Sequence, residues 1–386
     1  MFRESDDIIV NLTVTRRCYA NCRGCINKIL TFSNDSVANS PDCDPARDTQ
    51  LVLKIADLHP QKTLTLCFYG GEPFLAQDEM EKIRRLLARS PAANRIRFMA
   101  YTTGELIGDN MAAHPELING MWLYSVSVDG RPEQHAMSRP GTDLAKITLS
   151  LEKLRSSYEG HILFWSTLRE DQSLLDCFLQ FMAMYSSGLV NHMFWHWVDI
   201  CVPYKDIDGY LVRYARELGQ VMVTYLNYLS AGKLLPLAHV NELILYLLAG
   251  RERGHTACGV ELAQNFDILD GVVHACADLP ACIGATGRDG SVEIAREILN
   301  SLTSYKQELG CYLCEAHFYC GGRCPVQALA GSPERTRQIC CLMRQHVSLV
   351  KDRIDEISHY MERHHLSLQQ VYDRSAFITR YTDVVP

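Results

Sequence analysis

Apolar residues follow two periodicities along the first 200 positions of the chain. Short β-branched and aromatic runs predict strands at 8–15, 63–69, 95–102, 121–129, 161–168 and 192–200. Apolar residues at helical spacing predict helices at 49–58, 78–88, 143–157 and 173–187. Strands that alternate with helices are typical of an α/β fold with βα units around a parallel sheet. Six units favour an open, six-stranded partial barrel over a closed eight-stranded one.

The remaining chain has three further parts. Two helices, at 210–229 and 240–248, are predicted to form a bridge after the barrel. A cysteine-rich segment with little periodicity follows, and we expect bound ligands rather than a large core to hold it together. Apolar residues then recur at steps of four and three along one helix face, at Met343, Val347, Val350, Ile354, Ile357 and Met361. The predicted domains are therefore 1–205, 206–255, 256–342 and 343–386.

Composition argues against three classes of protein. The 386 residues carry 38 Lys and Arg against 45 Asp and Glu, a formal charge of -7, without the basic clusters that neutralise nucleic-acid phosphates. The longest apolar run, around Leu243–Ala249, is far shorter than the roughly 20 residues of a membrane span. The first residues lack the basic and apolar regions of a secretory signal. We expect a cytoplasmic protein.

The 16 cysteines are unevenly distributed. Three lie within eight residues, at Cys18, Cys22 and Cys25, and nine more lie between 258 and 341. Isolated cysteines usually behave as small buried apolar residues. We assign this role to the four that stand alone, Cys43, Cys67, Cys177 and Cys201. The two dense groups require another explanation.

The first cysteine group follows the first predicted strand, at the carboxyl-end rim where βα barrels place their chemistry. Three thiolates on one short loop suit three irons of a four-iron cluster and leave the fourth iron open. Zinc and chance clustering are the alternatives, but zinc requires a fourth ligand that this loop does not offer. Other strand ends carry glycine or polar residues, at 70–73, 102–104 and 127–130, and the polar loop 32–46 can cover the rim. His196, Trp197 and Asp199 are candidates for a substrate wall or for core packing.

The cysteine loop, followed by Tyr69-Gly70-Gly71-Glu72-Pro73 after the second strand, resembles the radical S-adenosylmethionine (SAM) enzymes. The resemblance implies that Cys18, Cys22 and Cys25 hold a four-iron, four-sulfur (4Fe–4S) cluster whose open iron is chelated by SAM. It implies that the glycine turn contacts the amino group of the methionine part of SAM, where Glu72 can accept a hydrogen bond from the ammonium. Further cofactor contacts are implied at Thr102, Thr103, Ser127 and Arg139. Two departures are Ala136, in place of an Asp between His135 and Arg139, and Ile26, in place of an aromatic residue.

The downstream cysteines resemble the SPASM extension found behind many radical SAM barrels, which holds two auxiliary 4Fe–4S clusters. The resemblance assigns Cys258, Cys276 and Cys324 to the first cluster, with Cys282 or an open iron completing it. It assigns to the second cluster Cys311, Cys314, Cys320 and either Cys340 or Cys341. A zinc ribbon over 311–324 is the alternative, because Cys-x2-Cys pairs also bind zinc.

These resemblances imply a three-cluster enzyme that cleaves SAM to a 5′-deoxyadenosyl radical and oxidatively modifies a peptide or protein side chain, for example by cross-linking. Asp278, Asp270 and His274 are candidate acids or bases near the auxiliary ligands. Expected partners are a reductant such as flavodoxin or ferredoxin and a separate leader-binding protein, unless the barrel itself binds the leader. Three alternatives are maturation of anaerobic sulfatases, processing of a small cofactor precursor, and a non-catalytic electron carrier. In the sulfatase-maturing enzymes an Asp directly follows the equivalent of Cys276, whereas here Ala277 follows and Asp278 comes one residue later.

Overall fold

The computed structural model describes residues 6–31, 42–197, 202–276, 278–279, 282–286, 292–322 and 324–382. Six parallel strands lie side by side in chain order, which confirms the predicted α/β class and partial barrel. These strands are β1 (Ile8–Thr15), β2 (Leu64–Gly70), β3 (Ile96–Thr102), β4 (Met121–Ser127), β5 (His161–Leu168) and β6 (His192–Trp197). The end of the last predicted strand, with Asp199 and Cys201, lies outside the described residues, as does most of the polar loop 32–46.

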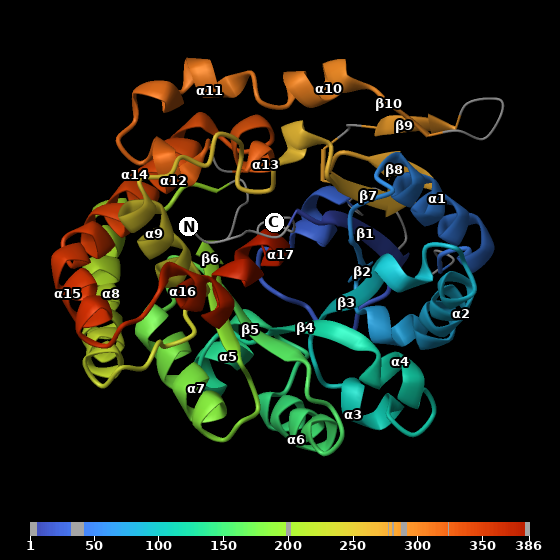
Figure 1. Ribbon diagram of the computed structural model, residues 1–386, viewed down its shortest axis with the longest axis horizontal. Helices are drawn as coiled ribbons and strands as arrows, with labels where there is room; N and C mark the ends of the chain where they lie inside the picture. The colour runs from blue at the N-terminus through green and yellow to red at the C-terminus, as the bar shows by residue number, and fades with distance from the viewer. Residues whose placement is uncertain are drawn as a thin grey trace.

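Helices cover the outer surface of the curved sheet (Figure 1). The four predicted helices are α1 (Pro45–Leu58), α2 (Gln77–Ala88), α6 (Leu144–Arg155) and α7 (Leu174–Ser186). Side-chain caps at Asp44, Asp143 and Ser173 fix the starts of three of them. Three helices not predicted from the sequence are α3 (Ile107–Asn110), α4 (Pro115–Asn119) and α5 (Pro132–Ser138). Each is too short to show a helical repeat.

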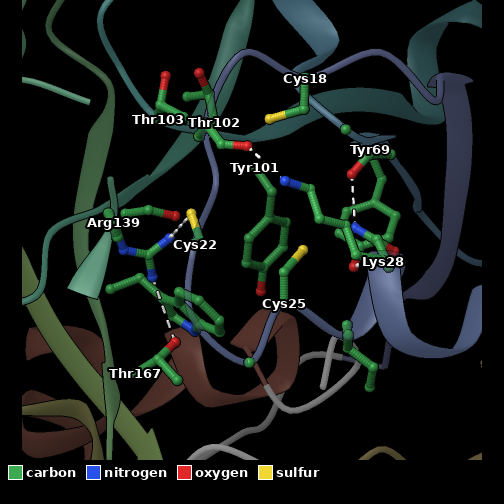
Figure 2. Close-up of a pocket in the computed structure, with 18 of the residues that line it drawn as sticks. Cys18, Cys22, Cys25, Lys28, Tyr69, Tyr101, Thr102, Thr103, Arg139 and Thr167 are labelled. Atoms are coloured by element: carbon green, nitrogen blue, oxygen red, sulfur yellow. Dashed lines mark hydrogen bonds between the residues drawn. The ribbon is translucent and has the colours of Figure 1, made fainter. Parts of the chain in front are cut away.

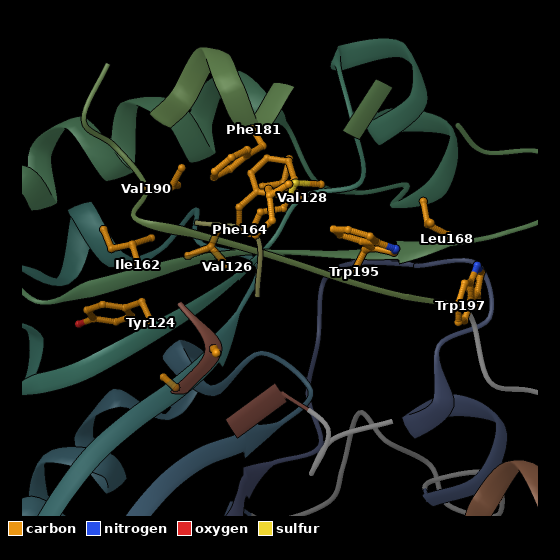
Figure 3. Close-up of a cluster of buried hydrophobic side chains, with 14 of the residues drawn as sticks. Tyr124, Val126, Val128, Ile162, Phe164, Leu168, Phe181, Val190, Trp195 and Trp197 are labelled. Atoms are coloured by element: carbon orange, nitrogen blue, oxygen red, sulfur yellow. The ribbon is translucent and has the colours of Figure 1, made fainter. Parts of the chain in front are cut away.

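The main core lies between the sheet and these helices (Figure 3). Alternate strand residues point outward, so Phe164 of β5 meets Phe181 of α7 at a ring distance of 5.9 Å. At the end of the sheet, Trp195 packs against His239 of the bridge helix α9 (Ala238–Ala249). Trp197 packs against Tyr214 of the bridge helix α8 (Ile207–Ser230). Trp197 is therefore a core residue and does not line a substrate wall. The predicted bridge helices are confirmed, with α8 three residues longer at its start.

The cysteine-rich segment continues the barrel sheet, which corrects the expectation that ligands alone organise it. Strand β7 (Asn265–Leu269) pairs in parallel with β1. Three antiparallel strands extend the sheet beyond it, β8 (Val272–His274), β9 (Cys282–Thr286) and β10 (Val292–Ile294). The segment also contributes Phe266, Ile268 and Val273 to the main core. Short helices follow, α10 (Arg296–Ser301), α11 (Tyr305–Glu308), α12 (His317–Cys320) and α13 (Pro325–Leu329).

The predicted single helix over 343–361 is two helices, and the first begins earlier. Helix α14 (Pro333–Lys351) is capped by Ser332, whose hydroxyl accepts from Arg335 N at 3.1 Å, and α15 (Ile354–Arg363) follows after a two-residue break. The apolar spacing continues across the break because both helices pack against the same core. Two further short helices are α16 (Leu368–Arg374) and α17 (Thr379–Thr382). None of the helices in the described ranges combines the length and hydropathy needed to cross a bilayer.

Residues 376–382 fill the interior of the barrel, and we call them the C-terminal plug (Figure 1). Ile378 and Tyr381 join the inward-facing side chains of the strands in a second apolar cluster. Tyr101 of β3 donates its hydroxyl to Tyr381 O at 2.5 Å, and Arg380 donates to Cys258 O at 3.3 Å. The plug thus contacts both the barrel wall and the start of the cysteine-rich segment.

Replacing Tyr381 by alanine is expected to destabilise the fold. Its side chain is 1% exposed and its ring packs edge-on against Trp122 at 4.7 Å, so truncation leaves a cavity inside the barrel. The expected cost is about 3–5 kcal/mol, which corresponds to a fall in Tm on the order of 5 °C. Val212→Ala is the control, because Val212 is 72% exposed on α8, and its Tm should match wild type within about 1 °C. A Tyr381→Ala variant with wild-type Tm would contradict the plug's structural role.

Candidate active site

The carboxyl ends of the strands enclose one cavity of about 670 Å³. Its lining contains every residue predicted to bind SAM or its cluster except Glu72 and Pro73, namely Cys18, Cys22, Cys25, Gly70, Gly71, Thr102, Thr103, Ser127 and Arg139. They come from the β1 loop, the β2 turn, the ends of β3 and β4, and the end of α5. Figure 2 shows the three sulfur atoms facing the same space. The structure therefore brings these distant sequence motifs together.

The three thiols of the cysteine loop are in a setting that suits a cationic cluster. Burial, with smaller contributions from the charges of Glu72, Cys22 and Cys25, raises the pKa of Cys18 to about 12. Burial, and then the charge of Cys22, also raise the pKa of Cys25. Within the described residues, no three Cys, His, Asp or Glu side chains converge closely enough to hold a single metal ion. The donor set of three thiols around a large cavity fits a multi-iron cluster, whose cations would favour the thiolate form.

The glycine turn after β2 docks against the start of the cysteine loop. Gly71 N donates to Thr15 O and Glu72 N donates to Arg17 O, each at 2.8 Å. A Cβ on Gly71 would lie 2.2 Å from Arg17 O, so only glycine permits this approach. The turn is therefore held where its backbone forms part of the cavity wall.

Glu72 has a different surrounding from the one expected. Its carboxylate is fully buried and accepts hydrogen bonds from Thr103 N at 2.7 Å, Thr102 Oγ1 at 2.8 Å and Phe74 N at 3.2 Å. Burial raises its pKa, and these donors oppose the shift. In this geometry Glu72 ties the glycine turn to the end of β3, and its contact with an ammonium stays a prediction.

Several cavity residues were missed by the sequence reasoning. Asn27, two residues after the third cysteine, donates to Gly70 O at 2.7 Å and accepts from the Tyr69 hydroxyl at 3.3 Å. Tyr101 and Trp165 face the cavity from β3 and β5, with their rings edge-on at 5.7 Å. His196, which was predicted as a wall or core residue, does not line the cavity and packs against Trp165 with ring centroids 4.4 Å apart. The inward alternation of each strand was the available signal for these aromatic residues.

The predicted acid and base candidates lie in three different settings. Burial, and then the charge of Asp278, raise the pKa values of the Tyr69 phenol and the Cys276 thiol. Asp278 is therefore near both groups. Asp270, at the exposed β7–β8 turn, is ion-paired with Arg16 of the cavity wall. His274 is half-buried on β8, and burial lowers its pKa. The charge of Asp267 of β7, which was not singled out from the sequence, also contributes to the raised pKa values of Tyr69 and Cys276.

A second cavity, of about 490 Å³, is lined by six cysteines. They are Cys311, Cys314, Cys320, Cys324, Cys340 and Cys341. The remaining predicted auxiliary ligands lie nearby. The charge of Cys324 contributes to the raised pKa of Cys276, and the charges of Cys324 and Cys258 contribute to the raised pKa of Tyr305, which lines this cavity. Cys282 is placed only by its backbone, which pairs with His274 between β9 and β8. The structure thus gathers the downstream cysteines around one region.

His135, beside the first cavity, predicts a pH dependence of stability. Asp129 N donates to its Nδ1 at 3.2 Å, and Nε2 lies 2.9 Å from Thr142 Oγ1, which itself donates to Arg139 O. The ring is therefore neutral with its proton on Nε2. Burial, and then the charge of Arg139, lower its pKa to about 4.

Because the unfolded chain binds this proton more readily, the stability that neutral His135 provides is present above about pH 6.5 and is lost as pH falls towards about 4. Between about pH 7.5 and 5.5, the wild type should lose on the order of 1 kcal/mol more than His135→Gln. Thermal unfolding of both proteins at the two pH values measures this difference. Parallel pH dependence in the two proteins would contradict the neutral, buried state of His135.

Comparisons with known proteins agree with this geometry. Residues 12–166 match the family model described as Radical SAM superfamily. The fold is similar to native anSMEcpe with bound AdoMet, at a TM-score of 0.64 and 16% identity, over 91% of this chain and 99% of that chain. It is similar to native anSMEcpe with bound AdoMet and Kp18Cys peptide, at a TM-score of 0.66 and 17% identity, over 91% and 99% of the two chains.

A weaker similarity links the chain to Streptococcus suis SuiB bound to precursor peptide SuiA, at a TM-score of 0.48 and 12% identity, over 77% of this chain and 64% of that chain. No curated protein sequence matches the chain. The two anSMEcpe similarities, at 16% and 17% identity, show the fold, whereas the family match covers most of the residues that line the first cavity. Residues 12–166 therefore form a domain of the radical SAM superfamily.

Proposed function

We propose that this chain is a cytoplasmic, oxygen-sensitive radical SAM enzyme that oxidatively modifies a side chain of a peptide or protein, as in the maturation of ribosomally made peptides. In this proposal Cys18, Cys22 and Cys25 hold the SAM-binding 4Fe–4S cluster. Two auxiliary clusters are held downstream, one by Cys258, Cys276 and Cys324 and one by Cys311, Cys314, Cys320 and Cys340. The expected reductant is a flavodoxin or ferredoxin.

The observation that carries the proposal is the presence of two separate cysteine-lined cavities, one at the rim of the barrel and one among the helices that follow the extended sheet. The first has three thiols beside a glycine turn, and the second has six thiols. Strand β7, which leads into the second group, pairs directly with β1, which leads into the first. A single electron-carrier cluster would not require the large cavity next to the first group.

When bound, the cluster and SAM supply the electron transfer that cleaves SAM to methionine and a 5′-deoxyadenosyl radical. The chain's part is to bind, orient and exclude water. Thr102 and Thr103 are held at the wall by Glu72, and Ile26, 7% exposed, gives an apolar contact surface in the cavity. Tyr69, Tyr101 and Trp165 form the interior side, where a substrate side chain would meet the cofactor.

A group that removes a proton from the substrate would lie between the two cavities. Asp278 is the best placed of the candidates, because it is near Tyr69 of the first cavity and Cys276 of the auxiliary group. Asp270 is already paired with Arg16 at an exposed turn. We therefore assign the role of general base to Asp278.

The test is anaerobic turnover of the reconstituted protein with dithionite, SAM and the short peptides encoded beside its gene. Expected results are 5′-deoxyadenosine above the no-enzyme background and a peptide lighter by two hydrogens in mass spectra. Absence of 5′-deoxyadenosine would overturn the enzyme proposal. Formation of 5′-deoxyadenosine with no change in any peptide would overturn the substrate assignment.

Maturation of anaerobic sulfatases is a second candidate, favoured by the position of Asp278. Although Ala277 rather than Asp follows Cys276, the carboxylate one residue later still lies near the Cys276 thiol. A sulfatase-type peptide with Cys or Ser at the target position distinguishes the two proposals. Oxidation of that residue to an aldehyde would support sulfatase maturation, and an unchanged peptide would remove it.

A further inference from the structure

Asp129, at the end of β4, is a fully buried carboxylate between two guanidinium groups. Arg139 Nε lies 2.9 Å from Asp129 Oδ2, and Arg139 Nη2 donates to Oδ1 at 3.1 Å. Arg169 Nη1 donates to Oδ2 at 2.9 Å, and Thr167 N donates to Oδ1 at 2.9 Å. Burial opposes ionisation of Asp129, but the two arginine charges outweigh it and hold its pKa below the usual value. One anion thus balances two cations whose side chains are each 8% exposed.

Both arginines extend from Asp129 to the cysteine loop. Arg139 Nη1 lies 3.7 Å from Cys22 Sγ, and Arg169 Nε donates to Arg23 O at 2.7 Å. Figure 2 shows Arg139 beside Cys22 at the cavity wall. The two guanidinium groups therefore meet neighbouring residues of the loop, one at a sulfur and one at a carbonyl.

We propose that Asp129 is the positioning residue for SAM binding, which acts by holding the Arg139 guanidinium at the Cys22 side of the cavity. This inference rests on the proposed function. Arg139 donates to Asp129 through Nη2, while its Nη1 reaches the Cys22 sulfur at the cavity wall, where the carboxylate of SAM is the anion available to the guanidinium. Without Asp129, two buried guanidinium groups would repel each other and Arg139 would lose its fixed orientation. Asp129 itself does not line the cavity.

The test is the SAM dissociation constant of iron-reconstituted variants, measured by equilibrium dialysis together with iron content and circular dichroism. Asp129→Asn is expected to weaken SAM binding about 10–100-fold at wild-type iron content, as the loss of an outer-shell partner typically does. Asp176→Asn is the matched control, because Asp176 accepts from Arg131 at a surface position outside the cavity, and its SAM affinity should match wild type.

A double-mutant cycle shows whether Asp129 acts through Arg139. Arg139→Gln should weaken SAM binding, and adding Asp129→Asn to it should cause no further loss beyond about twofold. Equal losses in both backgrounds, wild-type affinity of Asp129→Asn, or loss of iron together with affinity would each overturn the proposal. If Asp129→Asn does not fold, Asp129→Glu, which keeps the charge but moves it, takes its place in the same cycle. Failure of the wild type to bind SAM would instead overturn the proposed function.

Discussion

Replacing Cys18, Cys22 and Cys25 together by alanine is expected to reduce 5′-deoxyadenosine formation to the no-enzyme background, a loss of at least about 1,000-fold. The three thiols line one side of the first cavity, and SAM cleavage requires an electron delivered at that position. Iron content should fall by about four of an expected twelve per chain, because two auxiliary clusters would remain. Iron analysis and chromatography of the SAM reaction products measure both effects in the same samples.

Cys177→Ala is the control for the triple variant. Cys177 is fully buried in the core on α7 and does not line either thiol cavity, so its loss should leave both iron content and 5′-deoxyadenosine formation near wild type. Persistent 5′-deoxyadenosine formation in the triple variant would show that the cofactor site is elsewhere. An iron content near four with stoichiometric zinc in the wild type would instead contradict the two auxiliary clusters.

Local sequence signals were sufficient to predict the barrel and its rim. Most positions of the six strands are buried, as in strands covered on both faces, and β1 is buried at all eight positions. Because parallel strands end at one edge, motifs separated by some 50 residues could be placed together without knowledge of the packing. The Cys18–Cys25 loop, the Gly70–Gly71 turn and Thr102 accordingly line one cavity.

Contacts between distant segments could not be predicted in this way. Asp129 and Arg169 meet only because β4 and β5 end side by side, and neither residue belongs to a recognisable motif. The pairing of β7 with β1 joins residues more than 250 positions apart, through a strand of five residues that has no distinctive pattern. The C-terminal plug likewise has no periodicity, since its residues are selected by the shape of the barrel interior.

The directions of two side chains could not be predicted from residue type alone. Trp197 was a candidate for a substrate wall or for core packing, and because neighbours on a strand point to opposite faces, it packs outward on Tyr214, with ring centroids 5.3 Å apart. Three donors hold the Glu72 carboxylate inside the protein, and its contact with the ammonium of SAM stays a prediction. Residue type identified these positions, but only the register and the surrounding donors fix the direction of each side chain.

The helical position of Cys340 and Cys341 leads to the second prediction. Both lie on α14, where successive side chains are rotated by about 100°, so they cannot both face the same point. Burial, and then the charges of Cys320 and Cys311, raise the pKa of the Cys340 thiol to about 12. Cys341 Sγ instead accepts from Arg344 Nη2 at 3.2 Å. Both thiols line the second cavity, and we propose Cys340 as the ligand because the charges of Cys320 and Cys311 act on it.

Cys340→Ala is expected to lose about four irons per chain and to stop peptide oxidation by at least about 100-fold, while 5′-deoxyadenosine formation from SAM alone continues. Cys341→Ala is the matched control, because it removes the neighbouring thiol from the same helix, and it should retain wild-type iron and activity. Iron analysis and peptide mass spectra of the two variants provide the measurement. The reverse pattern would assign the ligand to Cys341, and equal losses in both variants would contradict the argument from helix geometry. The outcome thus tests whether one helix face is sufficient to complete the ligand set of the second auxiliary cluster.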